Sequence, residues 1–392
     1  MKKQIAALFC LFISLNGFCD KYVWNSKAPY PSFARHRCAA FTIGNKGYMG
    51  TGHINSGSIS QAYSDWWEFD PSSNSWTQKA DYPLQRFACA GFVIGNKGYL
   101  GGGNEQNFGD RDEFYEFDPI NNTWTQKANL PVANGGGLGF TINGVGYMAL
   151  FGSLYTYNLT ANSWSPVSCS IPFQDYSSGF VINNKVYVLP QGSNTLYMFD
   201  PSTGITTVKA TFIGDGRYAA CSFAVRGQGY IGLGYSWVNG TMLKDFYQYD
   251  PAANSWDTIP KSFPGVRRDY VPSFTIGDNA YFGTGSNGTN LGDIWGYEWK
   301  VSVGVEEKEK TTGISLFPNP ASDFLHITLS DEMVRSKTVF KLYNLNGKEM
   351  LSSSLSETNS KIDISMLPQG VYLSVILRND HETLSAKKII KY

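Results

Sequence analysis

Apolar and polar positions follow one recurring frame through most of the chain. Each copy starts with a short apolar strand, a turn and a second strand that ends in glycines, as in residues 41–48 and 92–99. A third segment alternates aromatic and polar positions, and a turn rich in proline, serine and asparagine separates it from a fourth segment. Alternation with a period of about two is typical of half-buried strands. The pattern therefore predicts an all-β fold built from four-stranded units.

The copies can be located by the aromatic residues that mark them. First strands start at Phe41, Phe92, Phe140, Phe180, Phe223 and Phe274, and second strands centre on Tyr48, Tyr99, Tyr147, Tyr187, Tyr230 and Tyr281. Fourth segments open at Trp76, Trp124, Trp164 and Trp256, whereas the fourth copy has Thr206 at this place. Six copies with a spacing of 40 to 51 residues indicate a repeat architecture in which neighbouring units bury a shared core.

The sixth copy stops at Trp299 without a fourth segment of its own. The missing segment occurs at the other end of the chain, because residues 23–28 match residues 75–80 around a tryptophan. A proline follows that tryptophan by seven residues in both places, at Pro31 and Pro83. Open sheet edges are a liability that closed folds avoid. We therefore expect the N-terminal strand to complete the sixth unit.

Together these markers resemble the kelch repeat. The glycine-rich stretch after the second strand, the aromatic pair in the third and the tryptophan that opens the fourth recur in order over roughly residues 21 to 300. The resemblance implies a six-bladed kelch β-propeller over residues 20–300, closed by the N-terminal strand. Copies three and four lack the full glycine triplet seen at residues 101–103, so their boundaries are the least defined.

The C-terminal part of the chain has a different pattern. Residues 301–312 include a run of five charged residues and are expected to be a linker. Residues 313–392 contain short strand patterns and predict a small immunoglobulin-like β-sandwich. Its strands are expected near Ile314–Phe317, Phe324–Leu329, Val339–Tyr343 and Val371–Leu377, with a hairpin turn at Asn346-Gly347.

Four motifs in this region resemble the C-terminal sorting domain of type IX secretion substrates. They are residues 316–325 (LFPNPASDFL), 345–348 (LNGK) and 367–372 (LPQGVY), and the basic end Lys387-Lys388. The resemblance implies recognition by the type IX secretion machinery at the outer membrane, usually followed by removal of the domain and release of the cargo or its attachment to surface lipopolysaccharide. The alternative is a passive sandwich that is merely appended to the propeller.

The N-terminus is typical of a secretory signal peptide over residues 1–19. Lys2 and Lys3 precede an apolar run from Ile5 to Leu15 that is too short for a stable membrane span. Cys19 would suit a lipoprotein, but Phe18 is bulky for the residue before a lipidated cysteine. These features predict a protein that is secreted or held at the outer-membrane surface of a Gram-negative bacterium, with membrane association only through surface attachment.

Composition narrows the possible partners. Lysine plus arginine equals aspartate plus glutamate, 32 against 32, which argues against a general affinity for nucleic acid. The mature chain would keep four cysteines, and small buried thiols are a simpler interpretation than disulfide staples in so long a chain. These are Cys38, Cys89, Cys169 and Cys221.

One positional series suggests a binding site. Six residues before each first-strand phenylalanine, repeat logic predicts a ring of side chains around one mouth of the central channel. Its members are Arg35, Arg86, Asn134, Gln174, Arg217 and Arg268. Arginine forms forked hydrogen bonds with anionic groups, so these side chains are candidate ligand contacts. The alternative is that each arginine pairs with an acidic loop residue or caps a neighbouring blade.

A second series is acidic and precedes the third strands. Its members, Asp65, Glu113, Asp245 and Asp293, recur too regularly to form one active site and are expected to fix turns. Two histidines of the first unit, His36 and His53, are too few for the copper site of galactose oxidases, which are also kelch propellers. No cofactor or metal is therefore expected.

The leading hypothesis is a non-enzymatic extracellular module that binds a glycan or a protein at the arginine-lined mouth. The alternative is a carbohydrate-active enzyme, because kelch propellers also include sialic acid mutarotases and, less fittingly here, galactose oxidases. Such an enzyme would need a carboxylate or histidine within hydrogen-bond reach of an arginine.

Overall fold

The computed structural model describes residues 21–392 except 57–58, 260, 301–312, 345–347 and 380–381. The expected signal peptide and linker, and the Asn346-Gly347 turn, lie outside the described residues. The chain divides into two compact units, of which one is Tyr22–Trp299 and the other contains Lys300–Tyr392. Both are built from strands, with one short helix in the second unit.

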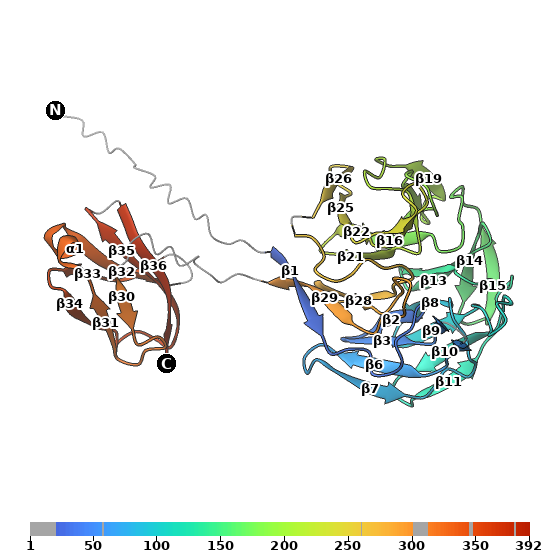
Figure 1. The fold of residues 1–392 in the computed structure, drawn as a ribbon, viewed down its shortest axis with the longest axis horizontal. Coiled ribbons are helices and arrows are strands. Elements are labelled where there is room, and N and C mark those ends of the chain that lie inside the picture. The colour runs from blue at the N-terminus through green and yellow to red at the C-terminus, as the bar shows by residue number, and fades with distance from the viewer. Residues whose placement is uncertain (1–20, 57–58, 260, 301–312, 345–347, 380–381) are drawn as a thin grey trace. The chain divides into compact units, whose positions relative to one another are not determined.

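The larger unit contains six four-stranded antiparallel sheets, arranged around a common centre (Figure 1). The first two are β2 (Ala39–Ile43), β3 (Lys46–Gly50), β6 (Trp66–Asp70) and β7 (Ser75–Lys79), then β8 (Ala90–Ile94), β9 (Lys97–Gly101), β10 (Phe114–Asp118) and β11 (Thr123–Gln126). The next two are β12 (Leu138–Ile142), β13 (Val145–Leu150), β14 (Ser153–Asn158) and β15 (Ser163–Val167), then β16 (Ser178–Ile182), β17 (Lys185–Leu189), β18 (Tyr197–Asp200) and β19 (Ile205–Val208).

The fifth sheet has the same order, and the sixth joins the two ends of the unit. The fifth is β21 (Cys221–Val225), β22 (Gln228–Gly232), β25 (Phe246–Asp250) and β26 (Ser255–Thr258). The sixth is β27 (Ser273–Ile276), β28 (Asn279–Gly283), β29 (Ile294–Lys300) and β1 (Lys21–Lys27). The ring of Trp24 lies 4.4 Å from that of Tyr297. The N-terminal strand thus occupies the place that the match between Trp24 and Trp76 predicts.

A closed cycle of backbone hydrogen bonds runs around the centre of the unit. Each amide in the cycle donates to the carbonyl of the equivalent residue in the preceding sheet, over N···O distances of 2.7 to 3.3 Å. The six residues are Arg37, Ala88, Gly136, Tyr176, Ala219 and Tyr270, and the last closes the cycle by accepting from the first. All six have positive φ, between 52° and 87°, although five are not glycine. This uncommon conformation turns each amide toward its neighbour.

Adjacent sheets are also joined at their outer strands. Asn74 has a φ of 50°, and its side-chain oxygen accepts a hydrogen bond from the backbone amide of Ala28 at 3.0 Å. The indole of Trp76 donates to the carbonyl of the same alanine, also at 3.0 Å. Equivalent pairs hold Ala80, Ala128 and Ala210. The asparagine-rich turn and its tryptophan are therefore one device that links neighbouring sheets.

Glycine recurs at the same position of several second strands because of how the sheets pack. A phenylalanine of one first strand covers a glycine in the second strand of the next sheet, as Phe41 covers Gly98. A Cβ atom at that glycine would lie 2.2 Å from the phenyl ring, far inside van der Waals contact. The same clash would occur at Gly47, Gly146 and Gly229. Glycine here lets bulky rings fill the space between sheets.

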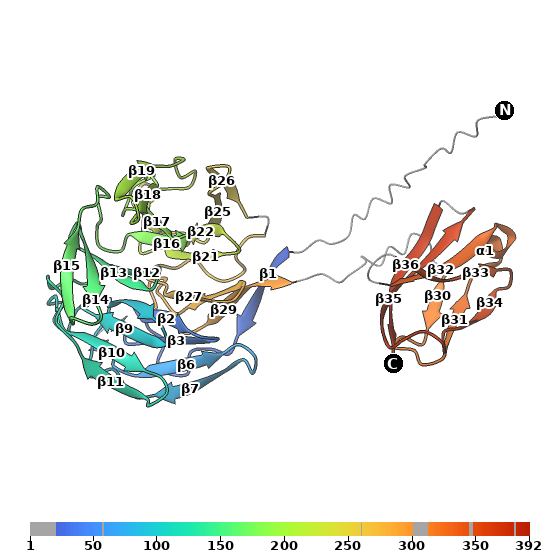
Figure 2. The same ribbon diagram turned by 180° about the vertical axis from the view of Figure 1, so that it is seen from behind.

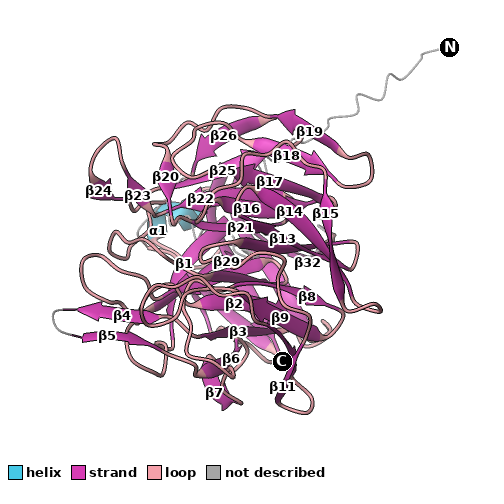
Figure 3. Cartoon of the chain, turned by 90° about the vertical axis from the view of Figure 1, so that its right-hand side faces the viewer, coloured by secondary structure: helices cyan, strands magenta, loops and turns pink. Residues whose placement is uncertain are grey.

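Short additional strands project from one side of this unit (Figure 3). β4 (His53–Ser56) pairs with β5 (Ile59–Ala62), and β20 (Arg217–Tyr218), β23 (Tyr235–Ser236) and β24 (Thr241–Met242) form a small sheet. The strands β4, β5, β23 and β24 belong to loops between second and third strands, whereas β20 precedes the first strand of the fifth sheet. Figure 2 views the unit from behind.

The smaller unit contains two sheets. One is β30 (Ser315–Phe317), β31 (Phe324–Thr328) and β34 (Asn359–Asp363), and the other is β33 (Glu349–Leu355), β32 (Thr338–Asn344), β35 (Gly370–Arg378) and β36 (Glu382–Lys391). The helix α1 (Asp331–Arg335) follows β31. Buried side chains from both sheets form one core that includes Leu325, Phe340 and Ile389. None of the helices in the described parts of the chain is long and apolar enough to cross a membrane.

Candidate functional site

The residues of the predicted ring series occupy equivalent places in the six sheets, but the arginines among them are buried. Each of the six predicted residues precedes a member of the backbone cycle by two positions. Arg35 and Arg268 are fully buried, Arg217 is 1% exposed and Arg86 is 7% exposed. Each arginine forms an ion pair with the acidic residue that precedes the third strand of its own sheet. The two series identified in the sequence are therefore partners of each other.

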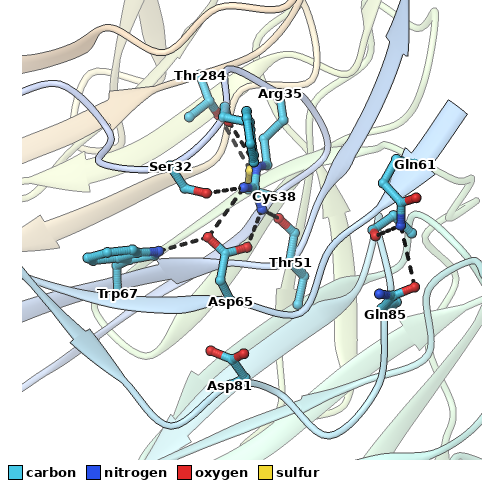
Figure 4. Close-up of polar contacts among 12 residues, drawn as sticks. Ser32, Arg35, Cys38, Thr51, Gln61, Asp65, Trp67, Asp81, Gln85 and Thr284 are labelled. Carbon is cyan, nitrogen blue, oxygen red and sulfur yellow. Dashed lines mark hydrogen bonds and ion pairs between the residues drawn. The ribbon is translucent and has the colours of Figure 1, made fainter. Parts of the chain in front are cut away.

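The same contacts recur in three sheets. Arg268 donates from Nε to the carbonyl of Val266 at 3.1 Å, from Nη1 to that of Thr284 at 3.2 Å, and to both oxygens of Asp293 at 2.7 Å. Arg217 and Arg35 repeat this set on Asp245 and Asp65. Figure 4 shows the version around Arg35, in which the Trp67 indole also donates to Asp65 at 2.8 Å.

These contacts account for most of the hydrogen-bonding capacity of the three guanidinium groups. Burial acts to raise the pKa of Asp293, but the hydrogen bonds and positive charge of Arg268 outweigh it and hold that pKa below its usual value. Charges that are already paired and buried are not available to an incoming ligand. The geometry favours the alternative that each arginine pairs with an acidic loop residue, while ligand contact by these arginines stays a prediction.

The remaining predicted residues differ from this pattern. Arg86 pairs with Glu113 through two contacts of 3.2 Å. Asn134 is buried and donates to Asp175 at 2.8 Å. Gln174 is exposed, and its backbone is fixed by hydrogen bonds to Ser177. Gln174 is thus the member of the series that faces solvent.

A different arginine, which the sequence series does not include, lies at the centre of the ring. The guanidinium of Arg37 lies 3.9 Å from the ring centroid of Tyr270 and donates to Nε2 of His36 at 3.1 Å. Among the described residues, no carboxylate comes within ion-pair distance of it. Tyr176 packs edge-on against Tyr270, with ring centroids 5.0 Å apart. An arginine held by aromatic faces therefore occupies the axial position.

Three titratable groups around Arg37 have shifted pKa values. Burial raises the pKa of Asp269 to about 7, although the charge of Arg37 acts in the opposite direction. Burial and the charge of Arg37 lower the pKa of His36 and of His53 to about 4. One oxygen of Asp269 and Nδ1 of His53 are buried without a hydrogen-bond partner. Both histidines are therefore neutral at pH 7, whereas Asp269 keeps its proton to a higher pH than an ordinary aspartate.

The larger cavity, of about 500 Å³, lies beside the third, fourth and fifth sheets. Its lining consists of Phe151, Gly152, Phe173, Gln174, Asp175, Gln191, Gly192 and Trp237. Trp237 is 61% exposed and stacks on Tyr218 at 5.0 Å between ring centroids, while Phe151 is 56% exposed. The side-chain amides of Gln174 and Gln191 have no hydrogen-bond partner among the described residues. The cavity thus combines exposed rings with uncommitted polar groups.

A smaller cavity, of about 250 Å³, lies beside the first sheet. It is lined by Ser32, Phe33, Tyr63, Ser64, Asp65, Trp67, Gln78, Asp81 and Gln85. Phe33 is 66% exposed, and the carboxylate of Asp81 receives one long contact of 3.4 Å from Gln78. In Figure 4, Asp81 and Gln85 lie apart from the Arg35 ion pair, with Gln85 accepting from Gln61.

The described parts of the chain contain no arrangement of side chains suited to metal binding or to thiol chemistry. There is no group of three or more histidine, cysteine, aspartate or glutamate side chains that could hold a metal ion. Cys38, Cys89, Cys169 and Cys221 are free. Burial raises the pKa of Cys38 to about 11 and that of Cys89 to about 12, so these thiols stay protonated and unreactive.

Comparison with protein families matches residues 315–392 to the secretion system C-terminal sorting domain. Human Kelch-like protein 23 is 24% identical over 266 residues, which cover 63% of this chain and 45% of the relative. Beta-agarase D of Zobellia galactanivorans is 33% identical over 82 residues, which cover 21% of this chain and 16% of that protein. The chain thus spans less than half the length of these curated relatives.

Among solved structures, that of YjhT superposes with a TM-score of 0.58 at 14% sequence identity. The superposition covers 68% of this chain and 95% of that chain. At this identity the likeness concerns the fold.

Proposed function

Since the chain is a kelch-type propeller followed by a type IX C-terminal sorting domain, we propose that it is an exported bacterial protein that binds a glycan outside the cell. The sorting domain implies secretion or export to the cell surface through the type IX machinery. The proposal includes a signal peptide over residues 1–19 and a Gram-negative source, because the type IX machinery acts at the outer membrane.

We also propose that residues 20–300 form a closed propeller of six blades and that residues 313–392 form an immunoglobulin-like sandwich. The backbone cycle supports the first point, because it links six equivalent residues and returns to its start. Contacts between neighbouring first strands support it as well, since they run from β2 through β8, β12, β16, β21 and β27 back to β2. Two stacked sheets around one core support the second.

The observation that carries the glycan proposal is the composition of the larger cavity. A sugar ring presents apolar C–H faces and a rim of hydroxyl groups, so it is recognised by an aromatic ring together with polar side chains. Trp237 and Phe151 supply exposed rings, and Gln174 and Gln191 supply amides that both donate and accept. A volume of about 500 Å³ suits a small ligand, for which pockets of roughly 300 to 1,000 Å³ are usual.

The local structure fixes the backbone of Gln174 and supports the indole of Trp237. Gln174 starts a tight turn in which the Ser177 hydroxyl bonds both its amide and its carbonyl. The Trp237 indole is supported on one side by stacking against Tyr218. Preorganised side chains lose little conformational entropy on binding, which favours affinity.

The proposal is tested on a glycan array with the full chain and with Trp237→Ala. We expect binding to weaken at least about tenfold in the variant, because the stacking surface is lost. Trp237→Phe keeps a ring and is expected to retain most of the binding. Phe108→Ala is a matched control, since Phe108 is an exposed ring on another loop outside both cavities. No glycan binding, or equal binding by Trp237→Ala, would contradict the proposal.

One observation favours an enzymatic alternative. Burial raises the pKa of Asp269 to about 7 against the influence of the Arg37 charge, and a carboxyl with such a pKa is suited to general acid–base catalysis. His36 also meets the requirement of a histidine within hydrogen-bond reach of an arginine. A sugar-anomerisation assay decides between the two functions, because an enzyme would accelerate anomerisation and Asp269→Asn would abolish the acceleration.

A further inference from the structure

We infer that the ligand is an uncharged polysaccharide that lies across one face of the propeller and occupies both cavities. This inference rests on the proposed glycan-binding function of the larger cavity. It adds a second subsite at the smaller cavity and specifies the chemical class of the ligand as neutral.

Both cavities open on the same face because of how the sheets are connected. In a four-stranded antiparallel blade, loops from second to third strands and connections from fourth to first strands lie on one side. The larger cavity is lined by such loops at Phe151, Gln191 and Trp237, and by a connection from a fourth to a first strand at Gln174. The smaller cavity uses the loop at Tyr63–Asp65.

The connections at residues 32–33 and 81–85 complete the smaller cavity. Figure 3 agrees with this assignment, since β4 and β5 project on the same side as β23 and β24. The first pair leads into the loop with Tyr63, and the second pair flanks Trp237. A single extended ligand can therefore approach both cavities from one direction.

The smaller cavity repeats the chemistry of the larger one with different residues. Phe33 supplies an exposed ring, and Tyr63 lies 5.8 Å from it between ring centroids. Asp81 has acceptor capacity left, because its one contact is long. The amide nitrogen of Gln85 has no hydrogen-bond partner among the described residues. These groups match the hydroxyl donors and acceptors of a sugar.

The charges of the residues that line the two cavities favour a neutral glycan over an anionic one. The ionisable side chains that line the cavities are Asp175, Asp65, Asp81 and the phenol of Tyr63, and neither lining contains lysine, arginine or histidine. Asp65 is neutralised by Arg35, but Asp81 has no cationic partner in the described parts of the chain. A uronate or other acidic sugar would meet like charges, which are unfavourable at short range. Neutral hydroxyl groups would instead donate to these carboxylates.

Two subsites on one rigid face predict a dependence of affinity on chain length. A chain that reaches both cavities binds the second one intramolecularly, so its effective concentration there is high. A short oligosaccharide occupies one cavity and gains nothing from the other. Recognition of a polymer is therefore expected to exceed that of its short fragments.

The experiment is isothermal titration of the full chain with laminarin, xyloglucan and galactan, each as polymer and as short oligosaccharides, and with alginate and pectate. We expect a neutral polymer to bind at least about tenfold more tightly than its short fragments. Phe33→Ala should remove this advantage, and short fragments should then bind only at the larger cavity. Because Phe33 is 66% exposed, the variant should keep its fold, which thermal melting checks.

The possible outcomes separate this inference from the proposed function. If Trp237→Ala abolishes binding while Phe33→Ala changes nothing at any chain length, the second subsite is wrong and the proposed function survives. If Trp237→Ala binds as well as the natural chain, the larger cavity is not the site and both fail. If alginate or pectate binds more tightly than every neutral polymer, the inference of an uncharged ligand is overturned.

Discussion

The propeller contains a framework of residues that recur from sheet to sheet and a set of loops that line the two cavities. The framework residues follow the repeat, whereas the cavity loops do not. Arg35, Arg217 and Arg268 make the same set of contacts in three sheets. Phe33, in contrast, has no aromatic counterpart at the equivalent places of these sheets, where Asp215 and Val266 stand, and Trp237 lies in a loop of variable length and sequence. Residues that repeat maintain the repeated geometry, whereas ligand recognition is concentrated where the repeat breaks.

Arg35 and Arg37 show the same difference within three residues. Arg35 is fully buried, and the carboxylate of Asp65 satisfies its charge. Arg37 is partly exposed at the axis and rests on the ring of Tyr270. The two arginines therefore have different roles: Arg35 belongs to the recurring framework, and Arg37 belongs to the mouth of the central channel.

The largest expected effect comes from breaking a framework ion pair. Arg268→Ala leaves Asp293 partly buried without its partner, which should lower the free energy of unfolding by about 3 to 5 kcal/mol. Tryptophan fluorescence in a urea titration isolates this effect, because all ten tryptophans precede residue 300. Arg226→Ala is the control, since its pair with Asp278 is exposed and worth at most about 1 kcal/mol. Equal stability of the two variants would contradict the structural role.

A smaller effect is expected from the strand that joins the two ends of the propeller. Trp24 donates to the carbonyl of Lys261, as Trp164 donates to that of Ala128 in another sheet. Trp24→Ala and Trp164→Ala should therefore destabilise the propeller similarly, by about 3 kcal/mol. The measurement is again the urea midpoint. A Trp24 variant as stable as the natural chain would contradict the proposed closure of the propeller by the N-terminal strand.

The axial cluster predicts a dependence on pH. Because burial raises the pKa of Asp269 to about 7, the folded state holds a proton that the unfolded state has released above about pH 4. This contribution is fully present below about pH 4 and is lost as the pH rises from there to about 7. Relative to Asp269→Asn, the natural chain should lose up to about 1.4 kcal/mol per pH unit between those values.

Urea titrations at several pH values between 4 and 8 measure this difference. The pKa values of His36 and His53 are lowered to about 4, so these residues favour folding above about pH 6.5 and act in the opposite direction. They are present in both proteins and therefore cancel in the comparison. A constant difference between the two proteins would contradict the shifted pKa of Asp269.

Much of the framework could be predicted from the sequence because its residues recur. The phenylalanine, tryptophan and asparagine positions gave the four-stranded frame, and the match of Trp24 with Trp76 predicted the pairing of β1 with β29. The residues of the ring series each precede a member of the backbone cycle by two positions, and their contact with a ligand stays a prediction. The sequence allows each arginine to pair with an acidic loop residue, but it does not identify Asp65, Glu113, Asp245 and Asp293 as those partners, because spacing alone does not reveal a side-chain pairing within a sheet.

The parts that could not be predicted lack a recurring signal. Five members of the backbone cycle adopt positive φ without being glycine, so composition does not reveal them. The cavity loops differ in length and sequence, which hides Trp237 and Phe33 from a repeat search. In the smaller unit, β33 escaped prediction because Ser352–Ser354 interrupt its apolar alternation.

The most direct test of ligand recognition by the non-repeating loops is hydrogen–deuterium exchange of the full chain with and without a bound neutral polysaccharide. The account predicts slower exchange in the segments around residues 151–152, 174–177, 191–192 and 235–240, with a smaller change around 63–65. Protection confined to the segments around Arg86 and Arg268, with the cavity loops unchanged, would contradict it.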